Sequence, residues 1–115
     1  MGAIRIVLVL ALAGVVAACA AQASAPAPVD TTQVTMPPSY RFDPPVIRVR
    51  VGATVTWRND DHFTHSVSVQ GGAFPLLNLP PGQSGQLTFN QAGEYNYICT
   101  YHPQNMKGTV IVVAS

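Results

Sequence analysis

The chain has 115 residues and a formal net charge of +1 at pH 7, from six basic and five acidic side chains. This length allows one small domain and no more. The balanced charge leaves no basic stripe for nucleic acid and no polybasic patch for a lipid surface, so the sequence argues against both kinds of binding.

The first 23 residues have the layout of an export signal. Arg5 is the only charge ahead of an apolar run, 6–18, that is short for a membrane-spanning helix. Two cleavage sites fit. Residues 16–19, Val-Ala-Ala-Cys, resemble a bacterial lipoprotein box with cleavage before a lipidated Cys19, whereas residues 21–23, Ala-Gln-Ala, fit ordinary cleavage after Ala23. In both cases we expect export to the periplasm or cell envelope, and in the first also attachment to the membrane through Cys19.

Residues 24–33 are rich in Ala, Pro and Thr without a hydrophobic period, which predicts a flexible linker ahead of a folded domain at 34–115. If Cys19 is lipidated or removed, Cys99 is the only thiol left in an oxidising compartment. A single thiol there favours a reactive or metal-bound group. A Cys19–Cys99 disulfide and an inert buried thiol are the alternatives.

From residue 34 onward the chain reads as short strands between turns, with no helical period of useful length. Alternating or β-branched runs lie at 47–51, 55–57, 65–69, 86–89, 95–99 and 109–113. This spacing predicts an all-β fold, an antiparallel Greek-key β-sandwich of about 7–8 strands. The period that buries Tyr95 and Tyr97 also turns the Cys99 thiol inward at the end of its strand.

One short segment gathers unusual side chains. Cys99, His102 and Met106 lie within eight residues, and His65 lies upstream of them. A soft thiolate, two imidazoles and a thioether suit copper in both of its oxidation states, so the first hypothesis is a copper electron-transfer site.

The region from about Tyr40 to Val113 resembles the cupredoxins, the small blue-copper family of plastocyanin, pseudoazurin and amicyanin. The resemblance is carried by four motifs: Phe42-x-Pro-x-x-Ile-x-Val, Trp57-x-Asn59-x-Asp61-x-x-x-His65-Ser-Val, Gly93-x-Tyr95-x-Tyr97-x-Cys99-x-x-His102-Pro and Met106-Lys-Gly-Thr-Val.

This resemblance implies an eight-stranded Greek-key sandwich that holds one Cu(I)/Cu(II) ion. It makes His65 the ligand from a separate strand, Cys99 and His102 the rest of a trigonal plane, and Met106 the weak axial donor. It also implies that Ser66 bridges to the loop that carries the cysteine.

The spacing of the axial donor departs from the pattern. Three residues, Pro103-Gln104-Asn105, separate His102 from Met106, which differs from plastocyanin, pseudoazurin and amicyanin. Gln104 could therefore offer a carbonyl oxygen in place of the Met106 sulfur. The Lys-Gly-Thr-Val that follows favours Met106.

Three other features have simpler interpretations. His62 lies among polar residues and is expected on the surface, and Met36 is expected to pack or to lie on the surface. The apolar segment 74–77, Phe-Pro-Leu-Leu, either surrounds the edge of His102 together with Pro103 as a docking patch or simply caps the core.

The predicted function is one-electron transfer between a transient donor and a transient acceptor by a monomeric protein that is not an enzyme. An envelope copper carrier or store that uses the same ligands without redox turnover is the alternative. A copper enzyme would need further histidines, typically in His-x-His pairs, and only three histidines occur, none of them so paired.

Overall fold

The computed structural model describes residues 2–3, 14, 26–71 and 73–114. The predicted signal, with Cys19 and both cleavage sites, lies outside the described residues except for positions 2, 3 and 14. Within the described ranges, no helix is long and apolar enough to cross a membrane.

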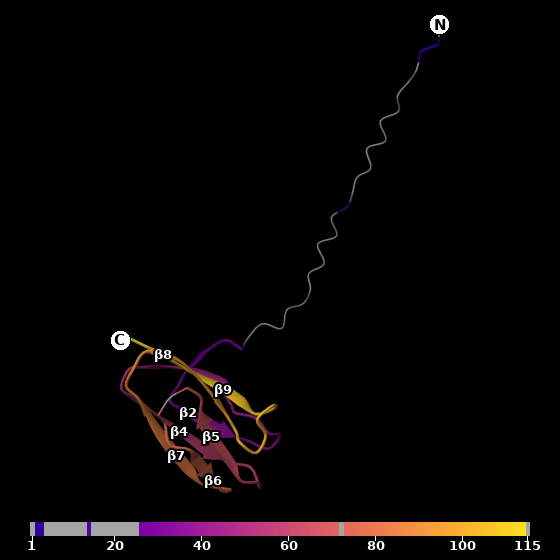
Figure 1. The fold of residues 1–115 in the computed structure, drawn as a ribbon. Coiled ribbons are helices and arrows are strands. Elements are labelled where there is room, and N and C mark those ends of the chain that lie inside the picture. Colours follow the sequence, from indigo (N-terminus) through magenta and orange to yellow (C-terminus); the bar gives the residue numbers. More distant parts are fainter. Residues whose placement is uncertain (1, 4–13, 15–25, 72, 115) are drawn as a thin grey trace.

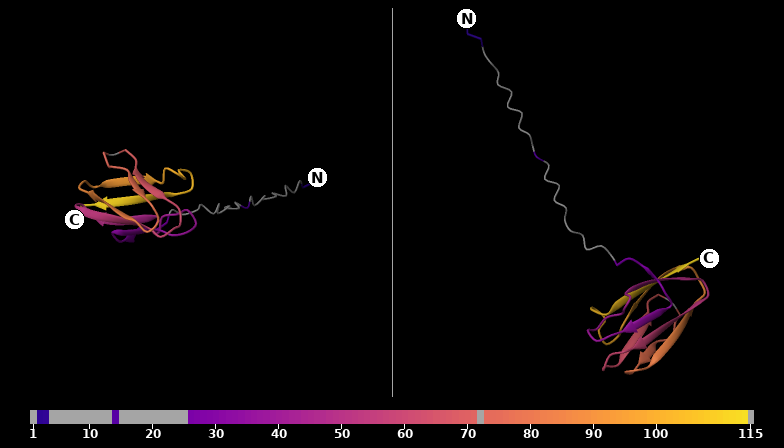
Figure 2. Two further views of the ribbon diagram at one scale, coloured as in Figure 1. Left: turned by 90° about the horizontal axis from the view of Figure 1, so that it is seen from below. Right: turned by 180° about the vertical axis from the view of Figure 1, so that it is seen from behind.

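The described residues form nine strands arranged in two sheets (Figures 1 and 2). The strands are β1 (Val29–Asp30), β2 (Gln33–Met36), β3 (Val46–Arg50), β4 (Ala53–Asn59), β5 (His65–Val69), β6 (Leu77–Leu79), β7 (Ser84–Phe89), β8 (Gly93–Ile98) and β9 (Lys107–Val113). One sheet has the order β1-β3-β9-β8-β5-β6, and the other has the order β2-β4-β7. The predicted all-β Greek-key sandwich is confirmed.

The pairing of the strands is mixed rather than purely antiparallel as predicted. β1 with β3, β2 with β4 and β3 with β9 are parallel, and the other four pairings are antiparallel. The chain moves from one sheet to the other after each of β1, β2 and β3. Strands reached by such crossovers can run parallel, whereas a tight hairpin allows only antiparallel neighbours.

Strand β3 shows why the alternating pattern forms a sheet with one face in the core. Ile47 and Val49 are buried, while Arg48 and Arg50 are exposed. Gly52 then turns the chain into β4 with a φ of 89°, a conformation that glycine adopts without strain. The burial of one face therefore follows directly from the period of two.

The folded domain begins earlier than predicted. Val29 and Asp30 pair with β3, and the Asp30 carboxylate accepts hydrogen bonds of 2.7 and 3.0 Å from the Arg48 guanidinium. Val34 on β2 pairs with Trp57 and is buried. The segment 24–33 was predicted as a flexible linker because a two-residue, fully exposed strand leaves no hydrophobic period in the sequence.

Aromatic rings form the centre of the core. The ring of Tyr97 lies 4.7 Å from that of Phe42 and 5.4 Å from that of Trp57, both nearly edge-on. Such edge-to-face pairs stabilise beyond the area they bury. Tyr95 braces the corner before β8, since its hydroxyl donates to the carbonyl of Gln91 at 2.8 Å. The predicted packing roles of both tyrosines are thus found in the structure.

Candidate metal centre

The predicted donors gather at one end of the sandwich. His65 opens β5, Cys99 follows the last residue of β8, and Met106 immediately precedes β9. All three side chains are fully buried, and His102 in the intervening loop is half-buried. Because β8 pairs with both β5 and β9, the sheet brings these parts of the sequence to the same edge.

The Cys99 thiol and the His65 ring are neighbours. The Sγ atom of Cys99 lies 3.8 Å from Nδ1 of His65. A metal bonded to a thiolate at about 2.3 Å and to an imidazole at about 2.0 Å keeps those two atoms about 3.5–3.9 Å apart for bond angles of about 110–130°. The observed distance falls in that range, and the donor chemistry suits copper. These two residues therefore fit the metal.

The other ring nitrogen of His65 is held by a carboxylate. Nε2 lies 2.8 Å from Oδ2 of Asp61, and neither side chain is more than 5% exposed. An ionised carboxylate only accepts hydrogen bonds, so Nε2 donates to Asp61. In the neutral ring this leaves Nδ1, the nitrogen near the Cys99 sulfur, with the free lone pair that a metal would need. This hydrogen bond and that from the backbone N–H of His62 lower the pKa of Asp61, which keeps it ionised.

Asn59 fixes the position of Asp61 through hydrogen bonds. Its Oδ1 accepts from the backbone N–H of Asp61 at 2.9 Å, and its Nδ2 donates to the carbonyls of Phe63 and Leu79 at 2.7 and 2.8 Å. The side chain is fully buried, so these bonds satisfy polar atoms that water does not reach. The loop that leads to His65 is thereby held at both ends.

Backbone hydrogen bonds close the segment 99–106 into a compact loop. The N–H of His102 donates to the carbonyl of Cys99 at 3.1 Å, and that of Met106 donates to the carbonyl of His102 at 3.0 Å. The N–H of Cys99 in turn donates to the carbonyl of Met106 at 3.0 Å. The main chain therefore links three of the predicted metal ligands, Cys99, His102 and Met106, to one another.

Ser66 links β5 to this loop, as the resemblance implied. Its backbone N–H donates to the Cys99 sulfur at 3.4 Å, and its hydroxyl lies 3.8 Å from the same atom. The hydroxyl also accepts from the N–H of Thr100 and lies against the Thr100 hydroxyl, both at 2.7 Å. These contacts hold the two donor-bearing segments in register.

His102 is the third predicted ligand near this pair, and its contact with His65 is between the two rings. Its ring centroid lies 5.9 Å from that of His65. In the part of the chain that the structure describes, no three His, Cys, Asp or Glu side chains converge closely enough to hold a metal ion. The structure thus brings His65 and Cys99 together as a pair, with His102 one ring contact away.

The other residues considered from the sequence differ in whether they lie on the surface or in the core. His62 and Gln104 are exposed, whereas Met36 is fully buried in the core. Phe74 does not approach His102, since its ring packs 4.9 Å from Phe89 and 5.6 Å from Tyr95 at the start of β8. Of the two interpretations of the segment 74–77, the structure supports the core cap for Phe74.

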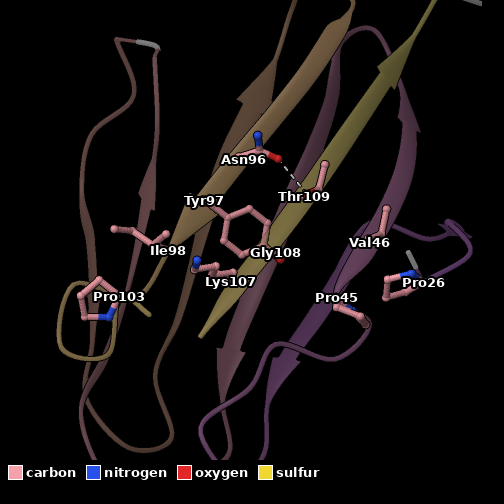
Figure 3. A pocket seen from close by; sticks show the side chains of 10 residues that line it. All are labelled: Pro26, Pro45, Val46, Asn96, Tyr97, Ile98, Pro103, Lys107, Gly108 and Thr109. Carbon is pink, nitrogen blue, oxygen red and sulfur yellow. Dashed lines mark hydrogen bonds between the residues drawn. The ribbon is translucent and has the colours of Figure 1, made fainter. Parts of the chain in front are cut away.

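A hollow of about 550 Å³ lies beside the loop and is distinct from the donors (Figure 3). Its lining side chains are Pro26, Pro45, Val46, Asn96, Tyr97, Ile98, Pro103, Lys107, Gly108 and Thr109. Among the residues that the structure describes, the lining includes no His, Cys, Asp or Glu, and Lys107 is its one charged member. It therefore offers no metal ligand of the usual kinds.

Two residues at the centre were given no role by sequence reasoning. Asp61 is part of the motif around His65, but only the folded loop shows that its carboxylate meets the ring. Tyr40 stands at the start of the matching region, and its ring centroid lies 4.4 Å from that of His102. An acid four residues before a candidate histidine ligand is a signal that could have identified Asp61; no comparable signal identifies Tyr40.

Comparisons with known proteins agree on one group. A family model described as a cupredoxin-like domain matches residues 8–112. Amicyanin-alpha of Methylorubrum extorquens is 36% identical over 103 residues, which cover 84% of this chain and 83% of the relative. A solved structure of an amicyanin variant in its reduced state is 35% identical, with a TM-score of 0.63 over 70% of this chain and 80% of that one. A copper-containing nitrite reductase from Thermus scotoductus is 34% identical, with a TM-score of 0.62, over 84% of this chain but 24% of the reductase.

Proposed function

Since this chain belongs to the cupredoxin family, whose members bind one copper ion, we propose that it is a small exported electron carrier with His65, Cys99, His102 and Met106 as its copper ligands. The observation that carries the proposal is the buried Cys99 sulfur 3.8 Å from a His65 nitrogen whose tautomer is fixed by Asp61. The relatives it matches are electron carriers, and the chain spans less than a third of the one copper enzyme described above.

A copper ion held by these residues would supply the one-electron chemistry of the Cu(II)/Cu(I) couple. The protein's part is to hold the ligands so that neither state requires a large rearrangement. Asp61 orients the His65 ring, and Ser66 keeps β5 in register with the loop. Backbone hydrogen bonds within the 99–106 loop restrain Cys99 and His102. This restraint supports electron transfer rather than copper carriage, because a carrier would need an open site that releases the metal.

We propose Met106 rather than Gln104 as the fourth copper ligand. Its side chain is fully buried, while Gln104 is exposed and lies outside the core. A thioether at this place is a weak, soft ligand that favours Cu(I). His102, the half-buried member of the set, is the ligand nearest to a partner protein. We propose transient contact of a monomer with its electron donor and acceptor at this end.

The proposals on export and membrane anchoring rest on the sequence of the first 23 residues. We propose delivery to the periplasm or cell envelope, with lipidation of Cys19 or cleavage after Ala23 as the two outcomes. Mass spectrometry of the N-terminus of the exported protein distinguishes them. A diacylglyceryl-modified Cys19 supports an anchor, and an unmodified Ser24 supports the soluble form.

The test of function is to add Cu(II) to the purified protein and record the visible spectrum. We expect an intense blue absorption that is lost in Cys99→Ser and in His65→Ala, and reversible one-electron reduction. His62→Ala is the matched control, because His62 is an exposed histidine three residues away and should leave the absorption unchanged. Copper bound without colour and without reversible reduction would favour the carrier instead.

A further inference from the structure

Tyr40 lies against the one predicted ligand that is not fully buried. Its ring centroid is 4.4 Å from that of His102 at an interplanar angle of 64°, and it meets His65 edge-on at 6.0 Å. Tyr40 itself is 42% exposed. The phenol ring therefore covers part of the His102 surface that would otherwise face solvent.

The backbone that carries Tyr40 is strained. Ser39 and Tyr40 have φ angles of 99° and 53°, and neither is glycine. Residues with side chains rarely adopt positive φ, and they keep it only where the surroundings over-determine the conformation. Such outliers concentrate at functional sites, so this pair of residues calls for a function.

The loop around Tyr40 is anchored on both sides. Thr35 and Asp43 exchange two backbone hydrogen bonds of 2.8 Å each, and the side chains of Met36 and Phe42 are buried next to them. In the described part of the chain, the Tyr40 hydroxyl takes part in no hydrogen bond. The position of the ring therefore comes from the backbone and from ring packing.

A second loop also contacts the Tyr40 ring. Phe63 stacks nearly parallel to Tyr40, with centroids 6.1 Å apart and an angle of 22°. The carbonyl of Phe63 accepts a hydrogen bond of 2.7 Å from the buried Asn59, and the N–H of Asp60 donates to the carbonyl of Met36 at 3.0 Å. The two loops are thus tied together, and Tyr40 contacts both Phe63 and His102.

We propose that Tyr40 is a positioning residue that holds the His102 imidazole against the interior and so slows its displacement from the metal. The support for this proposal is that two residues other than glycine keep positive φ angles where the Tyr40 ring meets His102. The part of this inference that concerns copper retention rests on the proposed function. The part that concerns the contact between the Tyr40 and His102 rings is independent of copper and is tested separately.

The first test uses the metal-free protein and NMR of the histidine side chains. In Tyr40→Ala we expect the His102 imidazole resonances to move toward those of the exposed His62 and its χ1 to average over rotamers. Tyr40→Phe, which keeps the ring, should preserve the parent values. A cooperative urea unfolding transition confirms that each variant is folded. If Tyr40→Ala does not fold, Tyr40→Leu, which also lacks the aromatic ring, replaces it. Unchanged His102 resonances and χ1 in the variant without the ring would overturn the proposal.

The second test measures transfer of Cu(I) to excess bathocuproine disulfonate. We expect Tyr40→Ala to release copper about three to ten times faster than the parent, the range that corresponds to loss of one aromatic contact. Tyr40→Phe should stay near the parent rate. Val51→Ala is the matched control, because Val51 is an apolar residue with the same 42% exposure as Tyr40 and lies in the turn between β3 and β4, outside the ligand loop. Equal rates for Tyr40→Ala and the parent would overturn the role in copper retention.

The two tests separate the proposals. If the parent protein yields no blue copper form, the proposed function fails, and the metal-free measurement still decides whether Tyr40 holds His102. If the parent is blue and the His102 ring is unaffected by loss of Tyr40, the positioning role fails while the proposed function stands.

Discussion

Gly108 is placed where no side chain fits. A Cβ atom there would overlap Cζ and Oη of Tyr97 and lie 2.7 Å from its Cε2. Tyr97 pairs with Gly108 across β8 and β9, and Figure 3 shows its ring beside this glycine. The ring is fully buried and packs edge-on against Trp57 and Phe42, so any shift of the ring breaks these two core contacts.

We therefore expect Gly108→Ala to lower the free energy of unfolding by about 3 kcal/mol, the upper part of the usual range for overpacking. Urea unfolding followed by tryptophan fluorescence measures this. Gly85→Ala is the control, because the three atoms nearest to a Cβ at Gly85 are methyl carbons of Leu77 and Leu79, at 3.1–3.3 Å, which can shift. Equal losses for the two variants would contradict the role given to Tyr97.

At this scale the sequence predicted the metal-site candidates but not all of their partners. Cys99 and His65 stand out because their chemistry is distinctive. Asp61 does not, because its contact with His65 depends on how the loop at 60–64 folds. Tyr40 reaches His102 through positive φ angles at two residues that are not glycine, and nothing in a sequence signals such a conformation.

Strands β1 and β2 contribute very differently to the domain although they are neighbours in sequence. β2 places Val34 and Met36 in the core, and it pairs with β4 along its whole length. β1 is exposed at both residues, and Val29 is 45% exposed at the edge of the larger sheet. The domain therefore depends on β2 far more than on β1.

Met36→Ala is expected to cost about 2–5 kcal/mol, as buried methionine truncations do. Val29→Ala, an edge position, should change the free energy of unfolding by less than about 0.5 kcal/mol. Chemical denaturation of both variants under the same conditions compares them. A large effect at Val29 with a small one at Met36 would show that the boundary of the core is misplaced.

The alternating strands were predictable because one buried face imposes a period of two. β3 and β8 show this period over five or six residues, which is long enough to recognise. β1 and β6 have two and three residues, too few for any period to appear. The parallel pairings depend on crossovers between sheets, which local sequence patterns do not encode.

For the whole molecule, the candidate centre joins segments that are distant in the sequence. The Cys99 sulfur contacts both His65 and Ser66, which lie 34 and 33 positions earlier. These residues meet only when β5 and β8 are paired in the sheet. Metal binding and the fold are therefore coupled, and ligand binding to the native state stabilises it.

With free copper at about 100 times Kd, we expect about 2.7 kcal/mol of added stability, which raises Tm of a domain this size by about 10–20 °C. Calorimetry with and without Cu(II) measures the shift. Cys99→Ser should abolish most of it, whereas His62→Ala should retain it. An equal shift in Cys99→Ser would mean that copper binds elsewhere.

The direction in which the chain enters the domain has a consequence for how the protein faces its surroundings. β1 runs parallel to β3, and β3 runs parallel to β9, which starts directly after the ligand loop. Pro26, ahead of β1, lines the same hollow as Pro103 in that loop. The described chain therefore enters the domain on the side of the 99–106 loop, so an attachment point upstream of Pro26 would be expected to face the proposed copper ligands rather than the opposite end of the sandwich.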